Sequence, residues 1–323
     1  MLASLRRRYP LARVVVFAPD LSPGLRDWIG ARPGIAWREF NAAQAHGWDC
    51  KPDCLLRLLE SGEREVVWLD SDLIVTGDLL AWLRRQPAEA LVVAEDPRHL
   101  PHRGTGGRTR AWGLAPGSER GFTVNSCVLR VTPAHAPLLR RWRELLARSD
   151  YRRAQQVHLL RRPFHLTSDQ DALGALLGSA DFAVGEIAVL RSGADLVHSG
   201  GFRMDVLRDR IARLGRRRVL CVHAIALKPW QMLPGAPEQR NFRWRLLRLA
   251  QELSDYTTEA RRLRDEIGMP CPWLDHRTVA GRGLRVLALG SAPVRGLLFA
   301  AAVTVAGFFG LGRRREAGTT AAS

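Results

Sequence analysis

The chain has 323 residues, which is enough for one large α/β domain with appendages or for two average domains. With 46% hydrophobic and 25% charged residues, it has the composition of a globular protein that buries a sizeable core without disulfide bonds. Its five cysteines are scattered, and no zinc-site spacing extends from Cys50 and Cys54, so we expect reduced thiols.

The net charge of +17 comes almost entirely from arginine, in short runs along the whole chain. No zinc finger, heptad zipper or aromatic-rich RNA-recognition motif accompanies these runs. We therefore expect a diffuse basic surface that suits anionic lipid and phosphate-bearing substrates, and we rank nucleic acid behind them as a partner.

Strands and helices are predicted to alternate over residues 10–230. Short apolar runs predict strands at residues 14–18, 35–40, 65–69, 91–94 and 127–131. Apolar spacing and capping residues predict helices at residues 2–9, 53–60, 133–147 and 171–178, and a short one from Ser22. This alternation predicts an α/β fold with an open, mostly parallel sheet flanked by helices. Residues 96–121 have no period and predict a long loop, and residues 243–267 predict a basic helix.

An acidic pair, Asp70 and Asp72, directly follows the apolar run 65–69. In an open α/β sheet, ligands bind beyond the carboxyl ends of the strands. Two neighbouring carboxylates repel each other unless a cation lies between them, and Mg²⁺ and Mn²⁺ accept carboxylates together with substrate phosphates. The pair therefore predicts a metal site, although two solvated aspartates in a turn would give the same motif.

Four segments in a fixed order carry a resemblance to a known family. They are EVVWLDSDLIVTGDL around Asp70, VNSCV at residues 124–128, SDQDAL at residues 168–173 and HAIALKPW at residues 223–230. Together they resemble glycosyltransferases with the GT-A fold, most closely family 8 and its bacterial relatives, the nucleotide-diphospho-sugar transferases. The resemblance covers roughly residues 1–235. It departs from the family at Cys127 and Ala226, where glycine is usual, and at Gly174, where asparagine is usual.

The resemblance implies that a sugar moves from a nucleotide-diphosphate donor to an acceptor hydroxyl, with Mn²⁺ or Mg²⁺ as cofactor. Asp70, Asp72 and His223 would bind the metal. Asp169 and Gln170 would be the catalytic residues, in the donor-sugar pocket. The substrate-binding residues would be Lys51, Arg57, Asn125, Asp171 and Lys228. Family 8 enzymes retain the anomeric configuration, so the resemblance implies a front-side displacement through an oxocarbenium-like state.

Several of these residues also fit a structural role. His223 follows an apolar run and fits a buried strand-end histidine. Asp171 fits the N-cap of a helix over residues 171–178. Lys51 and Arg57 fit solvated charges of the helix predicted at residues 53–60.

The resemblance also predicts how the chain is organised. Family members open with a strand and a base-binding loop before the segment that contains Met1. We therefore expect a sheet that lacks its first strand, a gap between the strands at residues 14–18 and 66–69, and an upstream coding segment for the missing strand. We predict a catalytic domain at residues 1–235, a helical extension at residues 236–275 and an apolar, basic tail at residues 276–323.

The tail suggests contact with a membrane. Residues 296–312 carry no charge, lie between basic residues and are at the lower length limit for a bilayer span. Because nucleotide sugars are cytosolic, we expect a cytoplasmic protein that is peripheral on the inner face of the cell membrane. A hairpin packed on the catalytic domain is the alternative. The acceptor would be a glycan, a lipid-linked sugar or another hydroxyl compound.

Two other functions compete with this one. A haloacid dehalogenase-like phosphotransferase also has an acidic pair after a strand, but there a Gly-Thr pair follows, where this chain has Leu73 and Ile74. A non-catalytic basic protein that binds membranes or nucleic acid is the third reading. It predicts binding that is unchanged by loss of Asp70 and Asp72.

Overall fold

The computed structural model of the chain consists of two compact units. The first comprises Met1–His198, Val219–His223 and Leu263–Pro270, and the second comprises Ser199–Arg218, Ala224–Arg262 and Cys271–Ser323. The structure describes residues 1–40, 47–97, 104–182, 185–200, 207, 210–211, 219–232, 242–275, 277–288 and 292–308. The end of the apolar stretch predicted at residues 296–312 therefore lies outside the described residues.

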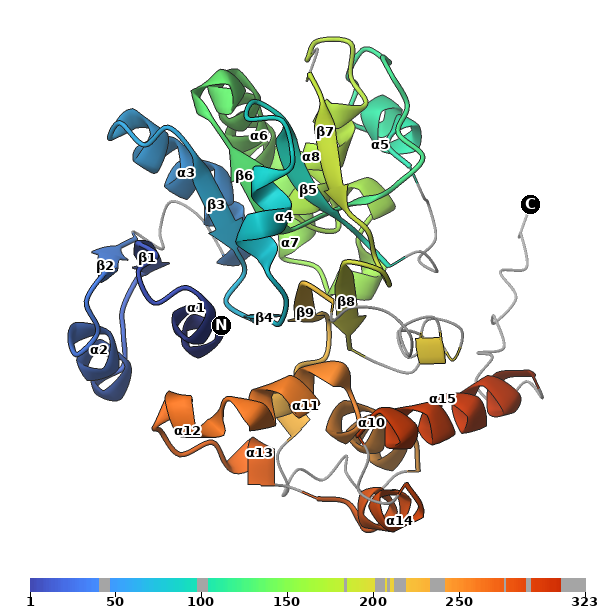
Figure 1. Cartoon of the computed structure of the whole chain (residues 1–323). Coiled ribbons are helices and arrows are strands. Elements are labelled where there is room, and N and C mark those ends of the chain that lie inside the picture. The colour runs from blue at the N-terminus through green and yellow to red at the C-terminus, as the bar shows by residue number, and fades with distance from the viewer. Residues whose placement is uncertain are drawn as a thin grey trace, which may run out of the picture. The chain divides into compact units, whose positions relative to one another are not determined.

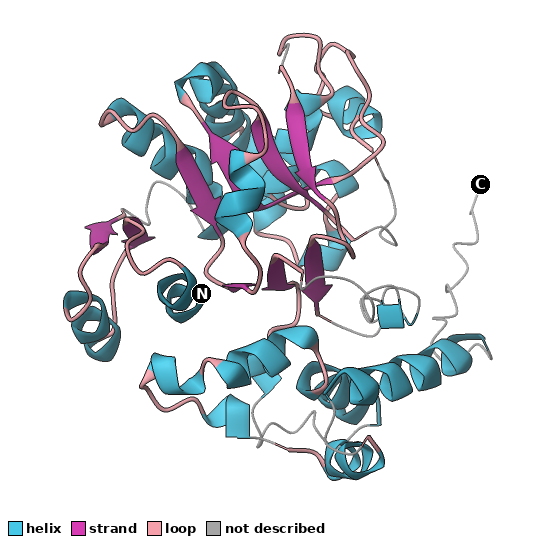
Figure 2. Cartoon of the chain, in the orientation of Figure 1, coloured by secondary structure: helices cyan, strands magenta, loops and turns pink. Residues whose placement is uncertain are grey.

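The described strands form three small sheets flanked by helices (Figures 1 and 2). The strands are β1 (Val14–Ala18), β2 (Ile35–Glu39), β3 (Val66–Leu69), β4 (Leu73–Val75), β5 (Leu91–Glu95), β6 (Val124–Val131), β7 (Ile187–Leu190), β8 (Leu196–Ser199) and β9 (Cys221–Ala224). The strand orders are β1-β2, β3-β6-β5-β7 and β4-β9-β8. The strands predicted at residues 14–18, 35–40, 65–69 and 91–94 are confirmed to within a residue at each end.

The first unit also contains helices, and those predicted at residues 2–9, 53–60, 133–147 and 171–178 and from Ser22 are among its described ones. The described α-helices of this unit are α1 (Leu2–Arg8), α2 (Pro23–Gly30), α3 (Lys51–Glu60), α4 (Leu79–Arg84), α5 (Gly106–Ala111), α6 (Ala136–Ala147), α7 (Ser149–Gln155), α8 (Asp169–Leu177) and α12 (Arg264–Ile267). Helix α5 lies inside the segment predicted as a loop. Tertiary contacts stabilise this helix although its sequence has no apolar periodicity. The Thr109 hydroxyl donates a hydrogen bond to the Ala175 carbonyl of α8 at 2.9 Å, and Trp112 is buried directly after the helix end.

The α/β class is confirmed, but the four-stranded sheet is mixed rather than mostly parallel. Strand β6 runs antiparallel to both β3 and β5, whereas β5 and β7 are parallel. Alternating helices and strands indicate the class. They do not specify the direction in which the chain re-enters the sheet after a connection as long as residues 96–123.

Both faces of the four-stranded sheet are covered by apolar side chains. In β5, Leu91 and Val93 belong to one core cluster, and Val92 and Ala94 belong to another. The first cluster includes side chains of α3, α6 and α8, and the second includes side chains of α4, β4 and β9. Burial on both faces explains the uninterrupted apolar run over residues 91–94 of β5, so polar side chains that could take part in chemistry lie at the strand ends.

Strands β1 and β3 lie in different sheets, and the sequence predicts a gap between them. Among the described strands, β1 pairs with β2 and β3 pairs with β6. All five side chains of β1 are only partly buried although all are apolar. The additional strand expected beside β1 stays a prediction.

The second unit is helical in its described part. Its helices include α10 (Phe242–Glu252), α11 (Asp255–Arg262), α13 (Pro272–Asp275), α14 (Val279–Leu287) and α15 (Ala292–Phe308). The single helix predicted over residues 243–267 is wrong, because the chain there forms α10, α11 and α12. Ser254 interrupts it as a helix N-cap, since its hydroxyl accepts a hydrogen bond from the Thr257 N–H at 3.1 Å. No helix among the described residues is long and apolar enough to cross a bilayer.

Ala226, which stands where the resemblance predicts glycine, has a left-handed backbone with φ of 58°. An L side chain in this region costs about 1–2 kcal/mol, and glycine avoids this cost. We expect Ala226→Gly to raise the free energy of unfolding by about 1 kcal/mol in urea titrations, after its greater unfolded-state entropy is allowed for. The matched control is Ala31→Gly, at a φ of −75°, which should lower it by about 0.5 kcal/mol. Equal effects of the two changes would contradict this account of Ala226.

Candidate functional site

Asp70 and Asp72 lie on the turn that joins β3 to β4. The Asp70 N–H donates to the Cys127 carbonyl at 2.9 Å, and the Leu73 N–H donates to the Asp70 carbonyl at 3.1 Å, which closes the turn. Strand β4 then pairs antiparallel with β9, in a register that sets Leu73 opposite His223. This register brings a histidine from far along the chain to the acidic pair.

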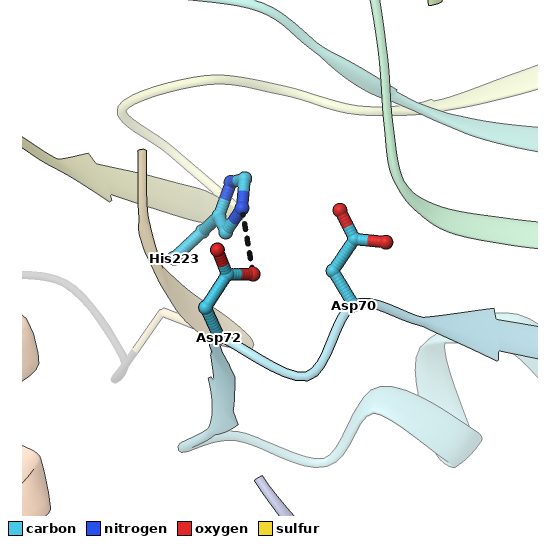
Figure 3. Close-up of side chains that lie close together, drawn as sticks. All are labelled: Asp70, Asp72 and His223. Atoms are coloured by element: carbon cyan, nitrogen blue, oxygen red, sulfur yellow. Dashed lines mark ion pairs between the residues drawn. The ribbon is translucent and has the colours of Figure 1, made fainter. Parts of the chain in front are cut away.

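The three predicted metal ligands come together at this turn. Asp70, Asp72 and His223 each offer a ligand atom, and these atoms all lie within 4.8 Å of one another. In Figure 3 the two carboxylates and the imidazole project to the same side of the turn. The Nε2 atom of His223 lies 3.2 Å from Oδ1 of Asp72. Two carboxylates and one imidazole at this spacing fit a divalent cation of the Mn²⁺ or Mg²⁺ type.

Lys51 is part of the same site through a buried ammonium group. Its side chain is 4% exposed, and Nζ lies 3.1 Å from Oδ1 of Asp70 and 3.3 Å from Oδ2 of Asp169. It also donates to the Ser126 hydroxyl at 2.6 Å. Lys51 is the first residue of α3. The alternative of a solvated helix charge is therefore wrong, because the side chain points into the protein and joins two predicted site residues.

The electrostatics of this cluster leave an excess of negative charge. Burial alone lowers the pKa of Lys51, but the carboxylates of Asp169 and Asp70 outweigh it and raise that pKa. Burial raises the pKa of Asp169, and the charge of Lys51 opposes this rise. In their ionised forms, the three carboxylates of Asp70, Asp72 and Asp169 against one ammonium leave two negative charges. A divalent cation matches that excess.

Asp169 and Gln170 form the first turn of α8, next to Lys51. Oδ2 of Asp169 accepts a hydrogen bond from the Ser126 hydroxyl at 2.8 Å, and the Asp169 side chain is buried. Gln170 is half-buried. Asp169 therefore lies within the polar cluster that contains Asp70, Gln170 follows it in the chain, and the roles assigned to both stay predictions.

Asp96 is a polar residue of this region that the sequence reasoning placed only in a loop. It follows β5 directly and is buried, and its Oδ1 accepts a hydrogen bond from Nδ2 of Asn125 at 2.8 Å. Burial raises the pKa of Asp96 to about 7, although hydrogen bonds from Asn125 and Gln170 lower it. Its position after a buried strand, like that of Asp70, is the signal that identifies it. Asn125 and Gln170, both predicted to line the donor pocket, are thus linked through Asp96.

Asp171 has a structural role that differs from the predicted one. Helix α8 is capped by Ser168, and Asp171 occupies the third helical position in a reciprocal capping box. Its Oδ2 accepts from the Ser168 N–H at 3.0 Å, and its Oδ1 accepts from Nε of Arg108 at 2.7 Å. The N-cap assignment for Asp171 is wrong by three positions. Its substrate contact stays a prediction.

Arg57 and Lys228 are the remaining residues for which donor contacts are predicted. Arg57 is exposed on α3, with its guanidinium 5.6 Å from the centre of the Phe40 ring. Lys228 belongs to the second unit, where its ammonium donates to the Ala224 carbonyl. The donor contacts predicted for both residues stay predictions.

Cys127, at the position where the resemblance predicts glycine, is a core residue. It is fully buried and belongs to the core cluster that contains Leu73 and Val128. Burial raises the pKa of its thiol well above the usual range. The side chain at this position is therefore part of the hydrophobic core.

Comparisons with known proteins give little that identifies the chain. No family model matches it, and no curated protein matches it. A solved structure described as a glycosyltransferase involved in the glycosylation of the major capsid of PBCV-1 is similar over 67% of this chain and 94% of its own, with 9% sequence identity and a TM-score of 0.39. A TM-score this low does not establish a shared fold.

Proposed function

We propose that the chain is a metal-dependent glycosyltransferase of the GT-A type, acting on a nucleotide-diphosphate sugar. The convergence of Asp70, Asp72 and His223 carries the proposal, because three residues assigned by motif resemblance meet at the end of β3. Lys51 and Asp169 adjoin them with opposite charges, so the cluster keeps the two negative charges that a divalent cation matches.

Asp70, Asp72 and His223 would hold Mn²⁺ or Mg²⁺, which when bound neutralises charge on the departing diphosphate. Lys51 holds the Asp70 and Asp169 carboxylates in fixed positions, so that little reorganisation is needed when the donor binds. Asp169, Gln170 and Asn125 supply amide and carboxylate groups that suit sugar hydroxyls.

The reaction proposed for this site is a front-side displacement with retention. The bond from the anomeric carbon to the diphosphate oxygen breaks, and a bond to the acceptor oxygen forms on the same face. The acceptor proton passes to the leaving diphosphate. The protein contributes position and electrostatic stabilisation, as the resemblance implies.

A screen of nucleotide sugars on the purified chain tests this function. Release of nucleoside diphosphate from one donor, dependent on Mn²⁺ or Mg²⁺ and stopped by EDTA, is the expected result. A generic phosphate ester run in parallel distinguishes a phosphotransferase. Metal-dependent cleavage of that ester, with no turnover of any nucleotide sugar, would show that the phosphotransferase reading is correct.

We also propose that the second unit binds an anionic membrane surface. Helix α14 exposes Val279, Val286 and Leu287, with 77%, 75% and 73% of each residue accessible. Seven- and eight-residue spacing sets these side chains on one helical face. Arg282 and Arg285 are exposed on the same helix. An aliphatic face beside arginines suits the headgroup region of anionic lipid, and the cytosolic donor pool places that surface on the inner leaflet.

Replacing Val286 and Leu287 together by serine should lower binding to vesicles of phosphatidylcholine and phosphatidylserine at least about tenfold, because buried aliphatic carbons contribute about 0.8 kcal/mol each. Sedimentation with vesicles measures this. The matched control replaces Val157 and Leu160, which are 42% and 74% exposed in the first unit, and should leave binding unchanged. Equal loss in both double variants, or no binding by the unaltered chain, would contradict the proposal.

A further inference from the structure

A second histidine, His198, lies directly behind the metal-binding candidate His223. His198 is on β8, next to β9 in the three-stranded sheet, and both imidazoles are buried. The Nδ1 atoms of the two rings are 3.2 Å apart, and Nε2 of His198 is 2.9 Å from the Glu95 carbonyl oxygen. Nε2 of His223 is on the other side, 3.2 Å from Oδ1 of Asp72. A continuous row of polar contacts therefore runs from the Glu95 backbone to the acidic pair.

The chemistry of this row fixes which nitrogen carries each hydrogen. A carbonyl oxygen only accepts, so Nε2 of His198 must donate to Glu95. When both rings are neutral, Nδ1 of His198 then has the lone pair and accepts from Nδ1 of His223. His223 is left with its lone pair on Nε2, the atom that faces Asp72. That tautomer is the one able to bind a cation at this place.

We propose that His198 is a positioning residue for the metal centre, which sets the tautomer and ring orientation of His223. The proposal rests on the metal site of the proposed function and adds a residue that none of the four motifs contains. An outer partner of this kind typically changes metal affinity 10–100-fold when it is removed. The Glu95 carbonyl is the fixed anchor, because it belongs to the backbone of β5.

A purely structural role for His198 has to be distinguished from this one. The two rings also pack edge to face, with centroids 5.3 Å apart and an interplanar angle of 63°. An apolar replacement keeps much of that packing but has neither donor nor acceptor. A glutamine supplies an N–H for the Glu95 carbonyl and an oxygen that accepts from His223, but no aromatic ring.

The test compares His198→Leu and His198→Gln in the full chain, with Mn²⁺ alone as the probe. Free Mn²⁺ is measured by electron paramagnetic resonance during titration, with no sugar donor present. We expect Leu to weaken Mn²⁺ binding about 10–100-fold and Gln to restore it to within about threefold of the unaltered chain. Binding by the Leu variant that stays within twofold, or equal loss in both variants, would overturn the proposal.

A measurement on the unaltered chain keeps the proposal testable if the Leu variant does not fold. Long-range ¹H–¹⁵N spectra of the histidine side chains, with Zn²⁺ as a diamagnetic probe, report which ring nitrogens carry hydrogen. We expect hydrogen on Nδ1 of His223 and on Nε2 of His198. A His223 ring without hydrogen on Nδ1 would overturn the proposal. Failure of the unaltered chain to bind Mn²⁺ would instead overturn the metal centre itself, and this inference with it.

Discussion

Asp72→Ala should lower kcat/KM for metal-dependent turnover of the donor more than about 100-fold. The substitution removes one of two carboxylates that converge with His223, and loss of a mere outer partner already costs 10–100-fold. Mn²⁺ binding should weaken in parallel, because hard divalent ions depend on charged oxygen ligands. Release of nucleoside diphosphate and a Mn²⁺ titration measure the two effects.

Asp27→Ala provides a matched control for this change. Asp27 is exposed on α2, so the same atoms and the same charge are removed away from the site. Its activity and Mn²⁺ affinity should equal those of the unaltered chain. Turnover that is insensitive to EDTA, and equal in both variants, would contradict a metal role for Asp72.

Lys51→Met should destabilise the metal-free protein by about 3–5 kcal/mol, as expected when one partner of a buried ion pair is removed. The change keeps the length of the side chain but leaves the carboxylates of Asp70 and Asp169 without their ammonium partner. Urea unfolding with EDTA present measures the loss. Arg57→Met, on the exposed face of the same helix, is the control and should change stability by no more than about 0.5 kcal/mol.

The stability lost in the Lys51 variant should depend on pH. Burial raises the pKa of Asp169 and Lys51 opposes the rise, so removing Lys51 raises that pKa further. A carboxyl group with a folded-state pKa above its unfolded value of about 3.9 binds protons preferentially in the folded state, so its stability contribution falls as pH increases above that value. The difference in free energy of unfolding between the Lys51 variant and the unaltered chain should therefore be smaller at pH 5 than at pH 8. A difference that is the same at both pH values would show that Lys51 acts by packing alone.

Local patterns in the sequence were sufficient for the fold class and for the first half of the site. Short uninterrupted apolar runs indicate strands, so the runs at residues 14–18, 66–69 and 91–94 identified β1, β3 and β5, of which β5 is buried on both faces. Asp70 and Asp72 follow such a run directly, and this position identified them as candidate site residues. In an open α/β sheet, ligands bind beyond the carboxyl ends of the strands.

The rest of the site depends on contacts between segments far apart in the chain. Asp96 and His198 stand outside the four motifs, and they join the site because β5 and β8 end near it. Lys51 fitted both a donor contact and a solvated helix charge, and only the packing of α3 against the sheet showed that its charge is buried. His223 reaches Asp72 through the register of β4 with β9. A periodic apolar pattern specifies which side chains are buried, but it does not specify strand order, direction or register, and these are what bring distant polar side chains together.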